Sequence, residues 1–246
     1  MSAPCEIEQS PPYVRTLARS VCAIVFREAV LREGDTYRLL LDQGRLPIRG
    51  TGFLVAPNVV ATALHVVGNS ADAYALVFDF VSREGNAPSH IAAGHVRASL
   101  TLNANVRDIA PGYVFLCFDD PIIERAPLAL SPRFVARNEH VFAIGHPAGT
   151  TMKYFPAARV VASDNNRPVF TASDVGTTCG NSGSPFFSSD VHEGNHGVVG
   201  AVIASITRGR SDTRGYSQVT AVRTTRLANA VGALDSATCR MRAAHN

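Results

Sequence analysis

Two short segments of the sequence carry residues suited to nucleophilic chemistry. The segment TTCGNSGSPFF (177–187) places Ser182 in a glycine-rich turn, two positions after Gly180. A serine nucleophile needs a turn that exposes its hydroxyl, a base that takes its proton, and backbone N–H groups that face the forming oxyanion. The segment GTGFLVAPNVVATALHVVG (50–68) contains His65, a candidate for that base. Alone, the first is also an ordinary Gly/Ser-rich turn, and the second an ordinary surface or core histidine.

Together the two segments resemble the catalytic motifs of the trypsin-like serine peptidases, which have the chymotrypsin fold. The likeness is greatest to the bacterial glutamyl-endopeptidase and Deg-type branches, which lack the animal disulfides. AIGHPAG (143–149) also resembles a segment that opens the second barrel in those groups. The resemblance implies that His65 is the general base, that Ser182 is the nucleophile, and that Gly180 and Ser182 form the oxyanion hole.

The carboxylate of a Ser–His–Asp triad orients the imidazole and stabilises its charged form. In RDIAPGYVFLCFDDP, Asp108 starts a strand as the family's aspartate does, but a proline and Gly112 interrupt that strand at once. In the other register Gly112 itself stands at the carboxylate position, and the spacing to the closing proline favours this register. We expect Asp108 to reach His65 through a short bulge. The alternatives are another acid, Asp72 or Asp79, or a dyad or degenerate site.

The family resemblance also places the substrate pocket. Its floor falls at Gly176, beside Thr177, and its wall on the segment that contains Val202 and Ser205. A negative floor would select Lys or Arg, so Gly176 argues against trypsin-like cleavage. The glutamyl-specific enzymes place a histidine where Val202 stands here. We therefore expect a small or medium uncharged side chain before the scissile bond.

Short apolar runs of strand length recur along the chain, separated by Gly, Pro, Asn and Asp. They include 21–26, 37–41, 50–56, 59–63, 74–80, 113–118, 140–145, 197–206 and 216–222. Many short strands with few helical patterns indicate an all-β protein. The resemblance specifies two packed six-stranded antiparallel β-barrels, chymotrypsin-like, with the catalytic groups at their junction. Helical patterns predict a short N-terminal helix in PYVRTLARSV and a C-terminal helix over 224–237.

The two-barrel interpretation divides the chain into three parts. We expect a flexible N-terminal arm over residues 1–12 and an N-terminal β-barrel over 13–130 that carries the histidine and the aspartate. A C-terminal β-barrel over 131–240 would carry the nucleophile and the pocket and end in the helix. The best boundary between the barrels is SPRF at 131–134.

Composition narrows the choice of partners and compartment. The 246 residues carry a net charge of +3, with no basic cluster for nucleic acid and no apolar run of about 18 residues for a membrane span. The N-terminus lacks the features of a secretory signal. Five scattered cysteines argue against a disulfide framework and favour a reducing, cytoplasmic compartment, with Cys179 expected as a buried, inert thiol. No metal or organic cofactor is required by the chemistry.

The leading interpretation is a serine endopeptidase that acts on a protein or peptide substrate. The alternative is a pseudoprotease or latent protease that binds peptide, or a regulatory partner protein, in the cleft between the barrels. The intact His65 and Ser182 favour the enzyme, whereas the interrupted strand after Asp108 favours the alternative. An esterase that uses the same nucleophile is a weaker third interpretation.

Overall fold

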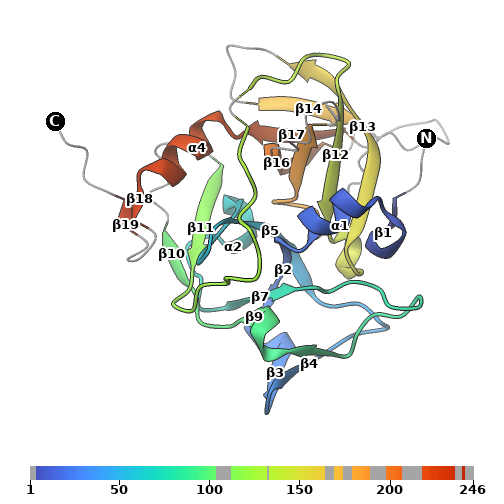
Figure 1. Ribbon diagram of the computed structural model, residues 1–246, viewed down its shortest axis with the longest axis vertical. Helices are drawn as coiled ribbons and strands as arrows, with labels where there is room; N and C mark the ends of the chain where they lie inside the picture. Colours follow the sequence, from blue (N-terminus) through green and yellow to red (C-terminus); the bar gives the residue numbers. More distant parts are fainter. Residues whose placement is uncertain are drawn as a thin grey trace.

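The computed structural model describes residues 4–103, 112–131, 133–163, 169–173, 179–188, 198–206, 218–235 and 240–241. Two curled bodies of β-sheet dominate, one toward each end of the molecule in Figure 1, with short helices at their edges. The α-helices are α1 (Pro12–Ala18), α2 (Leu64–Val67) and α4 (Thr225–Gly232). The 3-10 turns are η1 (Ile7–Gln9), η2 (Arg27–Ala29), η3 (Ala93–His95) and η4 (Pro147–Gly149).

The N-terminal barrel consists of a seven-stranded and a three-stranded antiparallel sheet. The larger sheet has the order β10-β11-β6-β5-β2-β7-β9, and the smaller one the order β3-β4-β8. The larger sheet comprises β2 (Val21–Phe26), β5 (Ile48–Ala56), β6 (Val59–Ala63), β7 (Tyr74–Phe78), β9 (Val96–Arg97), β10 (Thr101–Asn103) and β11 (Tyr113–Cys117). The smaller sheet comprises β3 (Val30–Glu33), β4 (Thr36–Leu39) and β8 (His90–Ala92). Near-continuous burial of β2, β6 and β11 explains their unbroken apolar runs.

The C-terminal barrel is a closed ring of six antiparallel strands, because each strand pairs with two neighbours. The ring comprises β12 (His140–Gly145), β13 (Lys153–Ser163), β14 (Val169–Ser173), β15 (Pro185–Ser188), β16 (Val198–Ile206) and β17 (Gln218–Arg223). From the other end of the chain, β1 (Cys5–Glu6) pairs with the start of β13. Part of the expected N-terminal arm therefore forms a seventh strand on the C-terminal barrel.

One hydrophobic cluster crosses the junction and joins the two barrels. It contains Phe53 and Val114 of the N-terminal barrel together with Phe142 and Phe187 of the C-terminal barrel. The rings of Phe142 and Phe187 stack with their centroids 4.9 Å apart, and Val14 of α1 is buried in the same cluster. Because this shared core is close-packed, it holds the two sides of the junction in a fixed relation.

The C-terminal segment differs from the sequence prediction of one helix over 224–237. Helix α4 ends at Gly232, and β18 (Leu234–Asp235) then pairs with β19 (Arg240–Met241). Leu227 of α4 is fully buried, whereas Leu234 is buried from the strand rather than from a helix face. Glycine is a weak helix former, so Gly232 is a natural place for the helix to end. None of the helices described in the structure is long and apolar enough to cross a membrane.

The cysteines also differ from expectation. Cys117 at the end of β11 is disulfide-bonded, whereas Cys5, Cys22 and Cys179 are free. The partner of Cys117 therefore lies outside the described residues. The prediction that the scattered cysteines form no disulfide is wrong at Cys117, since separation in the sequence says little about separation in the fold. Because disulfides are rare in reducing compartments, the bond at Cys117 means that the cysteines no longer support the prediction of a reducing compartment.

Candidate active site

The predicted nucleophile lies in a tight loop over residues 179–184, directly before β15. Gly180 and Gly183 have φ values of +100° and +88°, a backbone region that residues with a Cβ rarely adopt. A Cβ at Gly180 would overlap the carbonyl oxygen of His146. The two glycines therefore allow the loop to pack closely against the barrel junction while Ser182 stays partly accessible.

A buried threonine on β5, Thr51, fastens this loop to the N-terminal barrel. Its backbone N–H donates to the carbonyl of Ser182, 2.7 Å away. Its hydroxyl donates to the carbonyl of Gly180 at 2.8 Å and accepts from the N–H of His146 at 3.2 Å. The hydroxyl of Thr62 donates to the Thr51 carbonyl at 2.8 Å. The backbone N–H and the hydroxyl of Thr51 thus hold the nucleophile loop, while its carbonyl joins Thr51 to β6; the sequence motifs did not identify this role.

The predicted base, His65, lies where β6 meets α2. Its side chain is exposed, whereas the next residue, Val66, is buried in the core. Gly50 on β5 lies in space between Val66, which follows the histidine, and Ser182. A Cβ at Gly50 would be 2.6 Å from the Val66 side chain and 2.8 Å from the Ser182 carbonyl. The fold thus brings the His65 and Ser182 segments to the same place. No hydrogen bond joins their side chains among the described residues, as is common in enzymes without substrate.

The surroundings of His65 favour its neutral form. Although part of the His65 side chain is exposed, the surrounding protein removes some of its solvent and so lowers its pKa, and the positive charge of Arg49 lowers that pKa further. Arg49 lies one residue before Gly50 on β5, and its guanidinium lies over the Phe26 ring, 5.4 Å from the centroid. A neutral imidazole is the form that accepts a proton from a serine hydroxyl. Arg49 belongs to no sequence motif, and its influence depends on where the fold places its charge.

The expected carboxylate, Asp108, lies outside the described residues. The strand that follows it is described: β11 begins at Tyr113, which pairs with Ala63. The carbonyl of Gly112 accepts a hydrogen bond from the N–H of Leu64 at 2.9 Å. Gly112 therefore stands at the head of the strand, beside the residue that precedes the histidine. Gly112 is the residue that the second of the two sequence registers places at the carboxylate position.

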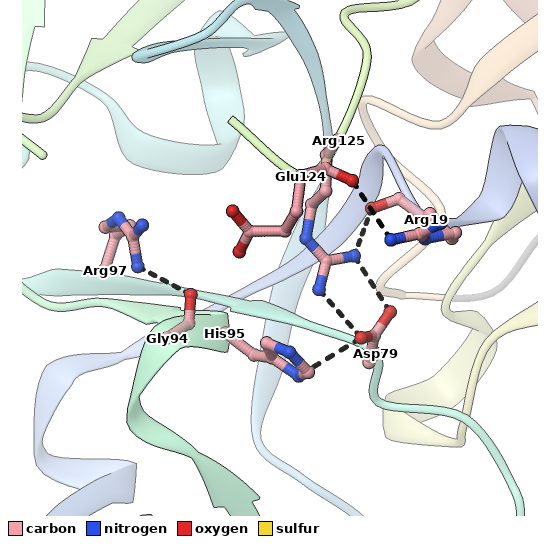
Figure 2. Close-up of polar contacts among 7 residues, drawn as sticks. All are labelled: Arg19, Asp79, Gly94, His95, Arg97, Glu124 and Arg125. Carbon is pink, nitrogen blue, oxygen red and sulfur yellow. Dashed lines mark hydrogen bonds and ion pairs between the residues drawn. The ribbon is translucent and has the colours of Figure 1, made fainter. Parts of the chain in front are cut away.

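The two alternative acids are engaged elsewhere. Asp72 accepts a hydrogen bond from the hydroxyl of Ser70 and is exposed. Asp79 accepts two hydrogen bonds from the guanidinium of Arg125, at 3.0 and 2.7 Å, and contacts His95 (Figure 2). Within the described part of the chain, no carboxylate contacts the predicted base.

The two N–H groups of the predicted oxyanion hole have no hydrogen-bond partner within the described part of the chain. The backbone N–H groups of Gly180 and Ser182 donate no hydrogen bond to any described residue. The carbonyl groups of the same two residues point to Thr51, so the loop is anchored through its acceptors and not through these donors. Such an arrangement could stabilise negative charge that develops on a substrate carbonyl beside the serine hydroxyl.

The predicted substrate pocket is described only in part. Gly176 and Thr177 lie outside the described residues. Val202 and Ser205 lie on β16, where their backbones pair with Ala221 and Val219 of β17. On its other side β16 pairs with β15, the strand that follows the nucleophile loop. The predicted wall strand is therefore next to the strand that begins just after Ser182.

Cys179 at the start of the nucleophile loop and His146, which contacts this loop, differ in burial. Cys179 is exposed and free, so the expectation of a buried thiol is wrong: the chain turns inward only at Gly180, which is buried. His146 follows β12 in the turn into η4 and is fully buried, with its ring 6.0 Å from that of Phe80. Burial lowers the pKa of His146 to about 4. Among the described residues, no group of three His, Cys, Asp or Glu side chains could hold a metal ion.

Comparison with known proteins agrees with this geometry. Residues 50–200, more than half of the chain, match the family model of the trypsin-like peptidase domain. No curated protein matches the sequence. Among solved structures, the M. tuberculosis protease Rv3671c in its inactive form is 19% identical, with a TM-score of 0.55 over 93% of this chain and 95% of that chain.

Two further structures share the fold. Human heparin binding protein is 14% identical, with a TM-score of 0.57 over 93% of this chain and 94% of its own. A serine endoprotease from Yersinia pestis is 16% identical, with a TM-score of 0.57 over 94% of this chain and 67% of its own. These similarities show a shared chymotrypsin-like fold, and the family match goes further: the chain belongs to the family of trypsin-like serine peptidases.

Proposed function

We propose that the protein is a serine endopeptidase in which Ser182 is the nucleophile and His65 the general base. The serine oxygen forms a bond to the substrate carbonyl carbon as its proton passes to the imidazole. The N–H groups of Gly180 and Ser182 bind the resulting oxyanion. The C–N bond then breaks, and the imidazolium gives its proton to the leaving amine. Water activated by the same imidazole hydrolyses the acyl-enzyme, so no cofactor takes part.

The observation that carries this proposal is the anchoring of the nucleophile loop by Thr51. Four hydrogen bonds centred on this residue join the loop, the His146 turn and β6. They orient the loop through its carbonyls and leave the N–H groups of Gly180 and Ser182 available. Two N–H groups without a described partner, beside an accessible serine, are the donors that an oxyanion hole requires.

We propose Asp108 as the third member of a triad. A latent or substrate-binding form remains the second candidate, and a specific observation favours it. Gly112 heads β11 beside the histidine segment, and no described carboxylate contacts His65. Loss of the triad carboxylate lowers kcat by about four orders of magnitude in a well-studied protease. In the binding form, the function is to hold a peptide or regulatory partner in the cleft between the barrels. In the latent form, binding of such a partner completes the catalytic site.

For specificity, we propose a small or medium uncharged side chain before the scissile bond. Gly176 would form the pocket floor beside Thr177, and Val202 and Ser205 would form its wall. None of these four residues carries a charge that would select a charged substrate side chain. Cleavage of a peptide library tests this directly, and a profile dominated by Arg, Lys or Glu at that position would contradict it.

Labelling with a fluorophosphonate probe tests the nucleophile and the base. We expect the wild-type protein to label, and Ser182→Ala and His65→Ala to lose labelling while retaining their far-UV circular dichroism. Asp108→Asn should label far more slowly, whereas Asp72→Asn, which removes an exposed carboxylate bonded to Ser70, should match wild type.

Two outcomes separate the candidates. Wild-type labelling that survives in Ser182→Ala refutes the assigned nucleophile. A folded wild-type protein that fails to label but binds peptide supports the latent or binding form instead of the active enzyme.

A further inference from the structure

The N-terminal barrel contains a pocket that the proposed peptidase chemistry does not use. It has a volume of about 510 Å³, within the range of small-molecule sites. Its walls come from η2, β3, β4, the η3–β9 segment and the turn after β11. In Figure 1, β3, β4 and β9 lie at the end of the molecule away from the C-terminal barrel, whereas α2, which carries the predicted base, lies near the centre. The pocket is thus separate from the active site.

Two arginines that line the pocket lack an ionic partner. The side chain of Arg27 makes no hydrogen bond or ion pair in the described structure, although its charge lowers the pKa of Asp72 at longer range. Arg32 donates only to the carbonyl of Gly34, through Nε at 3.4 Å. Each guanidinium keeps most of its donors available, in the planar geometry that suits phosphate and carboxylate groups.

A third arginine, Arg97, is already held in place. Its Nη1 donates to the carbonyls of Gly94 and Val96, at 2.8 and 3.0 Å, and its Nε donates to the carbonyl of Asp120 at 3.2 Å. Its guanidinium also lies over the Phe118 ring, 5.5 Å from the centroid. These partners carry no net charge and fix the orientation of Arg97 before any ligand arrives, while the carboxylates of Asp120 and Glu124 act on its charge without forming an ion pair.

The segment that carries Arg97 is tied to other parts of the barrel by the polar contacts drawn in Figure 2. His95, two residues earlier, lies with its Nδ1 3.1 Å from Oδ2 of Asp79. Asp79 in turn binds both terminal nitrogens of Arg125, whose side chain is only 1% exposed and also donates to the Arg19 carbonyl at 2.5 Å. A segment that is held in this way lowers the ordering cost of binding.

Two carboxylates also line the pocket, and one of them belongs to Asp120, the residue whose carbonyl accepts from Arg97. Both residues, Asp119 and Asp120, are exposed and form no ion pair with the three arginines. A polyanion such as a nucleic acid would meet these carboxylates and be repelled. A ligand that suits this mixed lining has one compact anionic group for the arginines and several hydrogen-bond donors for the carboxylates.

We propose that this pocket binds a phosphate monoester of a polyol, such as a sugar phosphate. The phosphate, with about −1.5 to −2 charge at neutral pH, would contact Arg27, Arg32 and Arg97. The hydroxyl groups would donate to Asp119 and Asp120. A single carboxylate suits one guanidinium in a two-pronged contact, whereas a phosphate offers enough oxygens for several.

Isothermal titration calorimetry with glucose 6-phosphate, inorganic phosphate and glucose tests the proposal on the full chain. We expect glucose 6-phosphate to bind, inorganic phosphate to bind more weakly, and glucose not to bind. Arg32→Gln should weaken glucose 6-phosphate at least about tenfold, because it removes charge-assisted hydrogen bonds. The matched control Arg137→Gln changes an exposed arginine in the loop before β12 and should leave binding unchanged.

A second variant tests the polyol half of the pocket. Asp119→Asn should weaken glucose 6-phosphate but strengthen inorganic phosphate, because it removes both an acceptor for hydroxyls and a repelling charge. Failure of both phosphate compounds to bind at about 10 mM, in a protein with normal circular dichroism, overturns the proposal, since even weak specific sites bind in the millimolar range. Equal binding by wild type and Arg32→Gln, or equal losses in Arg32→Gln and Arg137→Gln, also overturns it.

Discussion

Replacing Gly183 with alanine is the most direct test of how the nucleophile loop is held. Gly183 has a φ of +88°, and a Cβ there would overlap the Thr51 carbonyl and lie 2.5 Å from the Thr62 hydroxyl oxygen. The left-handed backbone costs an alanine about 1–2 kcal/mol, and forcing an extra carbon into a packed site costs about 1–3 kcal/mol more. We therefore expect Gly183→Ala to lower the free energy of unfolding by about 2–5 kcal/mol.

Gly34 provides a matched control. It also has a positive φ, +61°, but a Cβ there would meet no atom within 4 Å. Gly34→Ala should therefore lose only the backbone contribution, about 1–2 kcal/mol. Urea unfolding followed by far-UV circular dichroism measures both variants, and the fluorophosphonate labelling rate reports the position of Ser182. If Gly183→Ala is as stable as Gly34→Ala and labels at the wild-type rate, the loop is not held against Thr51 as described.

Two further predictions concern charge. Arg49→Gln should raise the pKa of His65, so that the acidic limb of the labelling rate moves to higher pH. The difference in this pKa between wild type and Arg49→Gln should shrink in high salt, because salt screens the charge. The control Arg137→Gln should leave the acidic limb where it is in wild type. His146 has a pKa of about 4 when folded and an ordinary value of 6.5, so the unfolded chain binds its proton first as the pH falls. Stability should therefore drop by about 3 kcal/mol between pH 6.5 and pH 4, and His146→Phe should remove that part of the slope in urea unfolding. An unchanged slope in this variant would mean that His146 is not buried in its neutral form.

Local sequence patterns predicted much of the fold. The runs at 21–26, 59–63 and 140–145 coincide with β2, β6 and β12, because consecutive buried residues leave a continuous apolar signal. The long strand β13 lacked such a signal. It contains Pro156 and Arg159, and its pairing shifts register near its end, so its apolar residues follow no simple alternation.

The active-site motifs were also recognisable without a structure. Ser182 and His65 lie in segments whose residue types suit a tight turn and a strand end, and the fold brings those segments together at Gly50. Asp108 lies outside the described residues and stays a prediction. Gly112, which the register favoured by the spacing places at the carboxylate position, lies beside the histidine segment.

The sequence by itself determined which residues could carry the chemistry, since turn geometry and strand patterns depend on neighbours along the chain. Only the tertiary structure decided how those residues are held and charged. Thr51 bonds to Gly180 across 129 positions, and Arg49 on β5 acts on His65 of α2. Hydrogen bonds, burial and electric fields act through space, so contacts between residues far apart in the sequence become visible only once the chain is folded.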